Sequence, residues 1–202
     1  VWSFGPKQAV PIMAVAAVMA NLARVLAWWR EVDWRAFLAY ALPGIPAAML
    51  GASTLLRLPS AAIDIGLGLF FLAMIPGRRW LEARRIRLSL WQLGLAGAAI
   101  GFLTGLVLST GPLSIPAFMA YGLTKGALLS TEAATSLFIY LTKVGTFRSL
   151  GAMPLMIFAK GLIVGSSLML GAFIGKALVR RMDERTFQLL LDGMMLLSGL
   201  FL

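Results

Sequence analysis

The stretch Leu108-Ser109-Thr110-Gly111-Pro112 interrupts an apolar segment that runs from Leu88 to Thr124. Proline removes a backbone donor, and Ser, Thr and Gly favour turns and caps, so this stretch predicts a helix that breaks. The whole segment is too long for one span of about 20 residues and too short for two. In a membrane, irregular backbone survives only where it lines a cavity or is buried in protein. The break therefore predicts both an unusual topology and a candidate site.

The composition around this segment is that of an integral membrane protein. Of the 202 residues, 60% are hydrophobic and 13% are charged, whereas soluble domains average roughly 45–50% and about 25%. The chain has no Cys and no His. It therefore has no disulfide, no thiolate chemistry, no histidine metal site and no Ser-His-Asp catalysis. The net charge is +10. We attribute the excess of Lys and Arg to cytoplasmic loops and not to nucleic-acid binding.

Six other apolar segments are expected to cross the membrane as helices. They are Gln8–Trp29, Ala36–Leu56, Ala61–Ile75, Ala127–Phe147, Pro154–Val179 and Thr186–Leu202. The predicted fold is an all-α integral membrane protein with six full spans and one broken or re-entrant segment.

The distribution of Lys and Arg decides how the broken segment runs. If it crosses once, eight cations fall on one side of the membrane and seven on the other. If it is a hairpin that returns to its starting side, twelve fall on one side and only Lys7, Arg57 and Arg148 on the other. The positive-inside rule favours the hairpin and assigns the side with twelve cations to the cytoplasm.

An internal repeat relates the two parts of the chain. Met49–Ala52 matches Met169–Ala172 at an offset of 120 residues, and Arg24 falls on Lys143 at an offset of 119. With the hairpin, residues 1–87 and 88–202 become two inverted repeats within one transmembrane domain, the architecture of many secondary transporters. By that symmetry, we expect a further hairpin of roughly 30–40 residues ahead of Val1.

Small residues spaced by four predict close packing between helices. There are three such sets: Gly97, Gly101 and Gly105; Gly161 and Gly165; and Ser167, Gly171 and Gly175.

The break is the first candidate binding site. A broken helix offers backbone N–H groups and a positive dipole end, both of which attract anions. Ser109 and Thr110 add hydroxyl groups, and Gly111 allows a ligand to approach the backbone. The alternative is a proline kink that only packs against its neighbours.

Two cations lie within apolar segments, where charge is expensive and usually functional. Arg24 and Lys143 correspond in the repeat and would suit an anion if they faced one cavity. Asn21 lies one turn before Arg24 on the same helix face. The alternative is that the long stems of both cations reach the interface.

The segment from 127 to 147 opens with a run of polar residues. Glu132 is its only acid, and it is a candidate for carrying a coupling proton, or a first-turn acid that the helix dipole favours. Thr131, Thr135 and Ser136 are candidates for lining the pathway, or for bonding back to their own helix.

Several short motifs resemble the sulfite exporter TauE/SafE family, also called the TSUP permeases. They are Gly101-Phe102-Leu103-Thr104-Gly105 with Gly111 and Pro116, Ala134-Thr135-Ser136-Leu137, Lys143 with Gly145 and Gly151, Gln8-Ala9-Val10, Asn21 to Arg24, and Val32-Asp33-Trp34. The first Gly-rich segment of the family is missing, and Thr110-Gly111 replaces its usual Gly-Gly pair. The resemblance implies a multi-pass protein of the bacterial inner membrane that moves sulfite, thiosulfate or organosulfonates.

The residues themselves predict an anion-compatible secondary transporter without a cofactor, a metal or a catalytic site. The resemblance implies that it is an exporter of a small sulfur-containing anion. An anion channel with the same donors and a non-transporting assembly subunit stay open as alternatives. An enzyme is disfavoured because the acids are scattered along the chain. The expected partners are the anion and membrane lipid, with a homodimer left open.

Overall fold

The computed structural model describes residues 6–59, 87–107, 110–179, 181–183, 186 and 189–190. Its elements are the helices α1 (Pro6–Trp28), η1 (Trp29–Glu31), α2 (Trp34–Arg57), α4 (Leu90–Leu106), α5 (Gly111–Tyr121), α6 (Lys125–Ser149) and α7 (Leu155–Val179). Four predicted spans coincide with α1, α2, α6 and α7. The predicted span 61–75 and nearly all of 186–202 lie outside the described residues.

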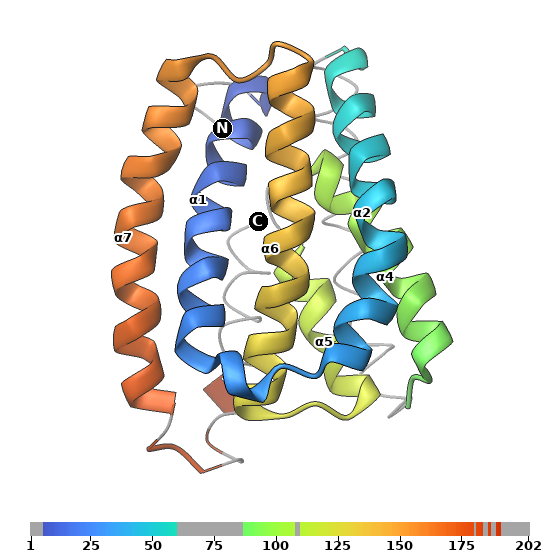
Figure 1. Ribbon diagram of the computed structural model, residues 1–202, viewed down its shortest axis with the longest axis vertical. Helices are drawn as coiled ribbons and strands as arrows, with labels where there is room; N and C mark the ends of the chain where they lie inside the picture. Colours follow the sequence, from blue (N-terminus) through green and yellow to red (C-terminus); the bar gives the residue numbers. More distant parts are fainter. Residues whose placement is uncertain are drawn as a thin grey trace.

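The outer helices are long and apolar enough to cross a membrane. Three helical stretches in the described part have that length and hydropathy: Ala9–Glu31, Trp34–Arg57 and Leu155–Lys176. Figure 1 shows α6 between α1 and α2, with α7 outermost beside α1. Large apolar side chains on α2 and α7 face outward, as expected for helices in lipid. Examples are Leu42, Leu50, Leu155, Ile163 and Ile174.

Local sequence signals explain where these helices begin and end. The Asp33 carboxylate accepts hydrogen bonds of 3.0 Å from the N–H groups of Arg35 and Ala36, and so caps α2. Ser89 and Gln92 form a capping box at the start of α4. Gly122 ends α5 with a φ of 112°, in the left-handed region that glycine enters without a steric penalty.

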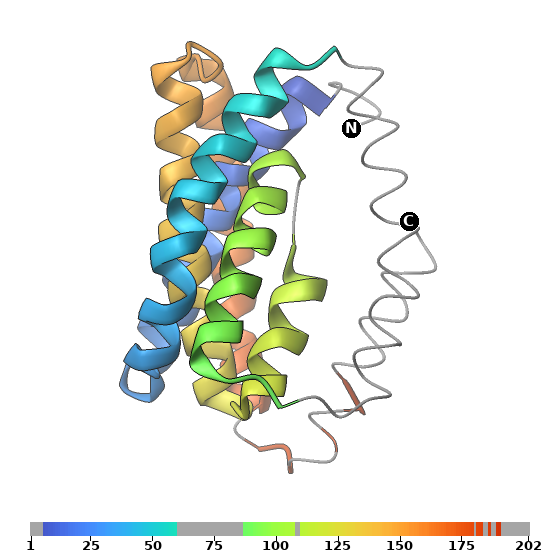
Figure 2. The ribbon, with the colours of Figure 1, turned by 90° about the vertical axis from the view of Figure 1, so that its right-hand side faces the viewer.

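The broken segment turns back, as the charge distribution predicts. Helix α4 starts at one end of the bundle and stops short of the other, and α5 returns beside it over a shorter distance (Figure 2). The N–H of Leu88, just before α4, donates to the carbonyl of Ala120, near the end of α5, at 2.9 Å. The two ends of the segment therefore meet at one end of the bundle. The break lies between Leu106 and Gly111.

Glycines bring α4 and α2 into backbone contact. A Cβ atom added to Gly101 would lie 2.8 Å from Gly44 Cα, and one added to Gly105 would lie 2.5 Å from Ala48 O. Gly97 meets the backbone of Tyr40 in the same way. The first predicted packing set is therefore confirmed, and it holds the hairpin against α2.

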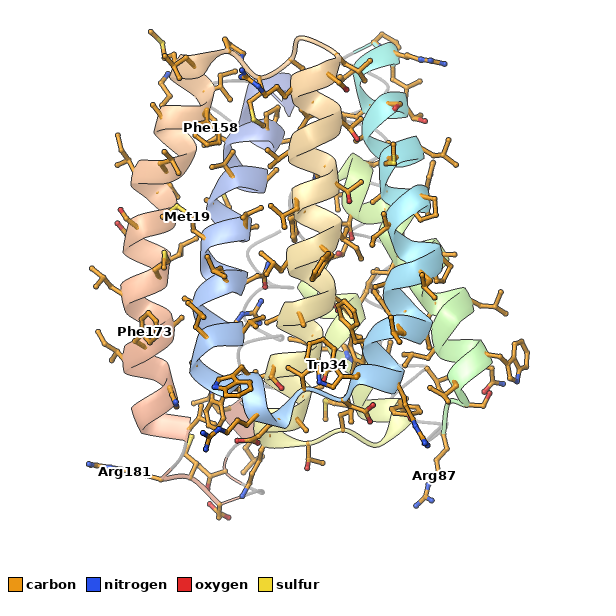
Figure 3. All side chains as sticks on the ribbon, in the orientation of Figure 1. Met19, Trp34, Arg87, Phe158, Phe173 and Arg181 are labelled. Atoms are coloured by element: carbon orange, nitrogen blue, oxygen red, sulfur yellow. The ribbon has the colours of Figure 1, made fainter. Side chains whose placement is uncertain are left out.

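The other two sets on α7 have different outcomes. Gly161 and Gly165 pack against α1, where added Cβ atoms would lie 2.5 Å from Val15 Cβ and 3.0 Å from Met19 Cβ; Met19 lies between the two helices in Figure 3. The set of Ser167, Gly171 and Gly175 meets no neighbouring helix in the described residues, so its packing stays a prediction. Within the described chain, nothing lies within 4 Å of a Cβ added to either glycine, because this stripe faces away from α1.

The two ends of the bundle carry different sets of charged residues. Trp34, Arg87 and Arg181 all lie at the end where α1 stops and α2 begins (Figure 3). Arg57 and Arg148 lie in the last turns of α2 and α6, at the opposite end. This arrangement agrees with the predicted charge asymmetry.

Candidate functional site

A cavity of about 210 Å³ lies beside the break. Thr110 and Gly111, at the start of α5, form part of its wall, and the rest comes from α1, α5, α6 and α7. Its other lining residues are Met13, Ala17, Ala20, Asn21, Arg24, Ile115, Glu132, Ser136, Tyr140 and Leu168.

The cavity is polar at one end and apolar at the other. On α1, the lining positions from Met13 to Arg24 form one helical stripe in which Asn21 and Arg24 come last. Helix α6 runs in the opposite direction, so Glu132 lies level with Arg24 and Tyr140 lies toward the apolar end. A ligand in this cavity would meet charge at one end and hydrocarbon at the other.

An ion pair forms the charged end. Arg24 Nη1 donates to Glu132 Oε2 at 2.9 Å, and Arg24 Nη2 donates to the side-chain oxygen of Asn21. The side chain of Arg24 is 31% exposed, whereas that of Glu132 is 4% exposed. The guanidinium is therefore accessible to a ligand, while the carboxylate is enclosed.

Glu132 also accepts hydrogen bonds from two serine hydroxyl groups. Its Oε1 accepts from Ser114 Oγ at 3.0 Å and from Ser136 Oγ at 2.8 Å. An ionised carboxylate only accepts hydrogen bonds, so three converging donors suit that form. This acid thus links α1, α5 and α6 at one point.

The hydroxyl groups of Thr104 and Thr110 form a hydrogen bond across the break. Thr104 Oγ1 lies 2.5 Å from Thr110 Oγ1 and donates to Ile100 O at 2.7 Å. Because the single hydroxyl proton of Thr104 points to Ile100, Thr110 is the donor in the bond between the two threonines. Thr110 lines the cavity, but its proton is engaged.

The expected array of backbone donors at the break is largely engaged as well. The N–H groups of Leu113 and Ser114 both donate to Thr110 O, at 2.9 and 3.0 Å, and Pro112 has no N–H. An anion would therefore rely chiefly on the Arg24 guanidinium. Ser109 lies outside the described residues.

Lys143 does not line the cavity, so the expectation of two cations facing one space is not met. Its ammonium donates to Thr104 O and, at 2.7 Å, to Val107 O. These carbonyls end α4, and the side chain is fully buried there. The negative end of the α4 helix dipole attracts the ammonium group, so it lies at the α4 carbonyls and not in the cavity.

Thr131 and Thr135 also lie away from the cavity. Thr131 Oγ1 accepts a hydrogen bond from the N–H of Asp33 at 2.9 Å, which ties the connection between α1 and α2 to α6. Thr135 Oγ1 donates to Glu132 O at 2.8 Å, the back-bonding alternative. Ser136 does line the cavity.

Sequence reasoning missed Thr104, Ser114 and Tyr140. Ser114 follows Thr110 by four residues, a spacing that places both on one helix face and was an available signal. Nothing in the sequence marked the contact of Thr104 with Thr110. In the part of the chain that the structure describes, no three Asp or Glu side chains gather into a candidate metal site.

The described residues combine long apolar helices, a helix rich in polar residues and a broken helix beside an ion pair and a small pocket. This combination is typical of membrane transport proteins. The chain belongs to the sulfite exporter TauE/SafE family, whose model matches residues 1–202. The resemblance seen in the sequence is thereby confirmed. Comparison with curated proteins and with solved structures gave no match. The family consists of membrane-integral transporters of sulfur anions and not of enzymes, which implies a small anionic substrate.

Proposed function

We propose that this protein is a secondary transporter that exports a small sulfur oxyanion or sulfonate, and that the cavity at Arg24 is its substrate site. One observation carries the proposal: a partly exposed guanidinium faces a half-open pocket next to a helix break. Guanidinium groups bind oxyanions through pairs of parallel N–H donors. Asn21 fixes the orientation of the group by accepting from Nη2.

The size of the cavity supports a small substrate. The cavity measures about 210 Å³. Pockets for drug-sized ligands measure roughly 300–1,000 Å³. A sulfite ion or a sulfonate with a short carbon chain fits within this space.

Glu132 is the proposed proton-coupling group. Its carboxylate and the substrate anion compete for the same guanidinium, since Oε2 already lies 2.9 Å from Nη1. Protonation of Glu132 removes this competitor and frees Arg24 for the anion. Release of the proton restores the ion pair and expels the anion. Binding of a proton and binding of an anion are thereby linked.

Alternating access by two inverted repeats, residues 1–87 and 88–202, is the proposed transport cycle. The hairpin of α4 and α5 and the charge difference between the ends of the bundle support this arrangement, with six full spans in the bacterial inner membrane. Arg24 is the proposed donor to the substrate, and Asn21, Thr110, Gly111 and Ser136 line the cavity around it. Ser109 is a further proposed ligand. Lys143, Thr131 and Thr135 support the site from outside the cavity.

A thermal-shift screen of the purified protein tests binding. Sulfite, thiosulfate and short sulfonates should raise the melting temperature, because a ligand that binds only the folded state stabilises it. Sulfate and acetate serve as comparison anions. Absence of any shift would favour the assembly-subunit alternative. Accumulation of anion in vesicles against its gradient, driven by a pH difference, distinguishes a transporter from an anion channel.

A further inference from the structure

The ammonium group of Lys143 lies in the interior, and no acid among the residues that the structure describes pairs with it. The side chain is 0% exposed, and the ion pair that the described residues contain joins Arg24 and Glu132 instead. An isolated buried charge is costly unless other groups stabilise it. Its surroundings must therefore supply that stabilisation in another form.

Two carbonyl groups and two aromatic rings supply it. Lys143 Nζ donates to Thr104 O and Val107 O. It also lies 5.5 Å from the centre of the Tyr140 ring and 5.9 Å from that of Phe147, within the range of cation–π attraction. Every one of these groups attracts a cation by its partial negative charge.

The two carbonyls belong to the C-terminal end of a helix that stops inside the bundle. Helix α4 ends at Leu106 with Val107 as its cap, and the last carbonyls of a helix have no partner within it. They also carry the negative end of the helix dipole. In secondary transporters, such C-terminal ends of half-helices and unwound carbonyls coordinate a coupling Na⁺ or H⁺.

We propose that the Lys143 ammonium is a tethered cation that fills a monovalent-cation site formed by Thr104 O and Val107 O at the end of α4. The chain thus supplies covalently the positive charge that other transporters take from solution. Folding of the break then requires no Na⁺ or K⁺. A further consequence, which rests on the proposed transport function, is that anion binding is independent of Na⁺.

Two substitutions separate the charge from the volume of the side chain. Lys143→Ala leaves the carbonyls and empties the space of the stem, whereas Lys143→Met fills that space with an uncharged chain. Melting temperatures of both variants and the parent are measured in chloride salts of Na⁺, K⁺, ammonium, methylammonium and choline at one ionic strength. No sulfur anion is present, so the result does not depend on the proposed substrate.

We expect both variants to melt below the parent in choline chloride. Small cations should then raise the melting temperature of Lys143→Ala by about 3 °C or more and leave Lys143→Met within about 1 °C. The parent should melt at the same temperature in all five salts. Choline is too large to enter the space and serves as the inert reference.

Three outcomes would overturn the proposal. Folded Lys143→Ala that melts identically in every salt has no cation site at this place. Lys143→Met that is as stable as the parent shows that the carbonyls need no cation. If neither variant folds, the melting temperature of the parent is the test. A melting temperature that depends on Na⁺ or K⁺ contradicts a site already filled by Lys143. The same melting temperature in Na⁺, K⁺ and choline salts supports the proposal.

Discussion

Arg24 and Glu132 are 108 residues apart in the chain and form an ion pair of 2.9 Å across the wall of the cavity. The pair joins α1 to α6 and thus connects the two proposed repeats. Glu132 is enclosed, so removal of Arg24 leaves a buried carboxylate without its cation, which is more costly than loss of the pair itself. The residue that is proposed to bind substrate is therefore also a structural residue.

Replacement of Arg24 should weaken anion binding. We expect Arg24→Gln to raise the Kd for sulfite or a short sulfonate by roughly 5- to 150-fold, the equivalent of about 1–3 kcal/mol for a charge-assisted contact. Titration calorimetry measures the change. Arg30→Gln is the matched control, because Arg30 is exposed beyond the end of α1.

A double variant separates binding from folding. Arg24→Gln with Glu132→Gln removes both charges, so it should melt closer to the parent than Arg24→Gln alone and still bind the anion weakly. Unchanged affinity in both Arg24 variants would show that Arg24 is not a ligand and would place the site elsewhere.

Glu132→Gln should remove the link between protons and anions. For the parent, the affinity for methanesulfonate should rise as the pH is lowered, because the proposed protonation of Glu132 frees Arg24 from the ion pair. A sulfonate keeps its own charge as the pH changes. In Glu132→Gln the affinity should be high and independent of pH, and uptake into vesicles should no longer respond to a pH difference. An equally steep pH profile in the variant would assign the coupling to another group.

The sequence predicted the limits of α1, α2, α6 and α7 because long apolar runs between charges mark spans whatever their neighbours are. It also predicted the break, because Pro112 removes a backbone donor and Gly111 disfavours a helix interior. It predicted the hairpin because that path places twelve cations on one side and three on the other. These properties belong to single segments. They can be derived without knowledge of which helices touch.

The contacts between helices could not be derived in this way. Lys143 and Arg24 both look like intramembrane cations, but only the position of the α4 C-terminus shows that Lys143 is drawn to Thr104 O and Val107 O. The stripe of Gly171 has the same spacing as that of Gly101, and only one of them faces a neighbouring helix among the described residues. Spacing identifies a helix face but does not identify what covers it.

A pair of alanine substitutions tests the packing of α4 on α2. Gly101→Ala should lower the free energy of unfolding by about 1–3 kcal/mol, since its Cβ would overlap the backbone of Gly44. Gly171→Ala is the control, and it should be neutral or should stabilise by up to about 1 kcal/mol, because alanine favours a helix and has space here. Melting in detergent measures both. Equal effects would mean that α4 does not contact α2 closely.

Single cysteines test the hairpin, and the chain has no native cysteine to interfere. Arg87→Cys and Thr124→Cys flank the broken segment, and Leu150→Cys lies at the other end of α6. We expect a membrane-impermeant maleimide to label the first two from one side of the membrane and the third from the opposite side. Labelling of Arg87→Cys and Thr124→Cys from opposite sides would mean that the segment crosses the membrane once.

The gradient from charge to hydrocarbon along the cavity predicts how affinity depends on the substrate's carbon chain. With the sulfonate group at Arg24, the chain points along α1 toward Ala17 and Met13, seven and eleven residues earlier, or about 10 and 16 Å along the helix axis at 1.5 Å per residue. Burial of each added methylene contributes about 0.8 kcal/mol, roughly a fourfold gain in affinity. Methane-, ethane- and propanesulfonate should therefore bind with successively lower Kd.

Ala17→Leu fills this end of the cavity, so it should weaken the binding of propanesulfonate much more than that of methanesulfonate. Ala27→Leu, at a position outside the lining, should not discriminate between the two anions. Equal affinities along the series would mean that the head group alone is recognised, and would favour sulfite over organosulfonates as the transported anion.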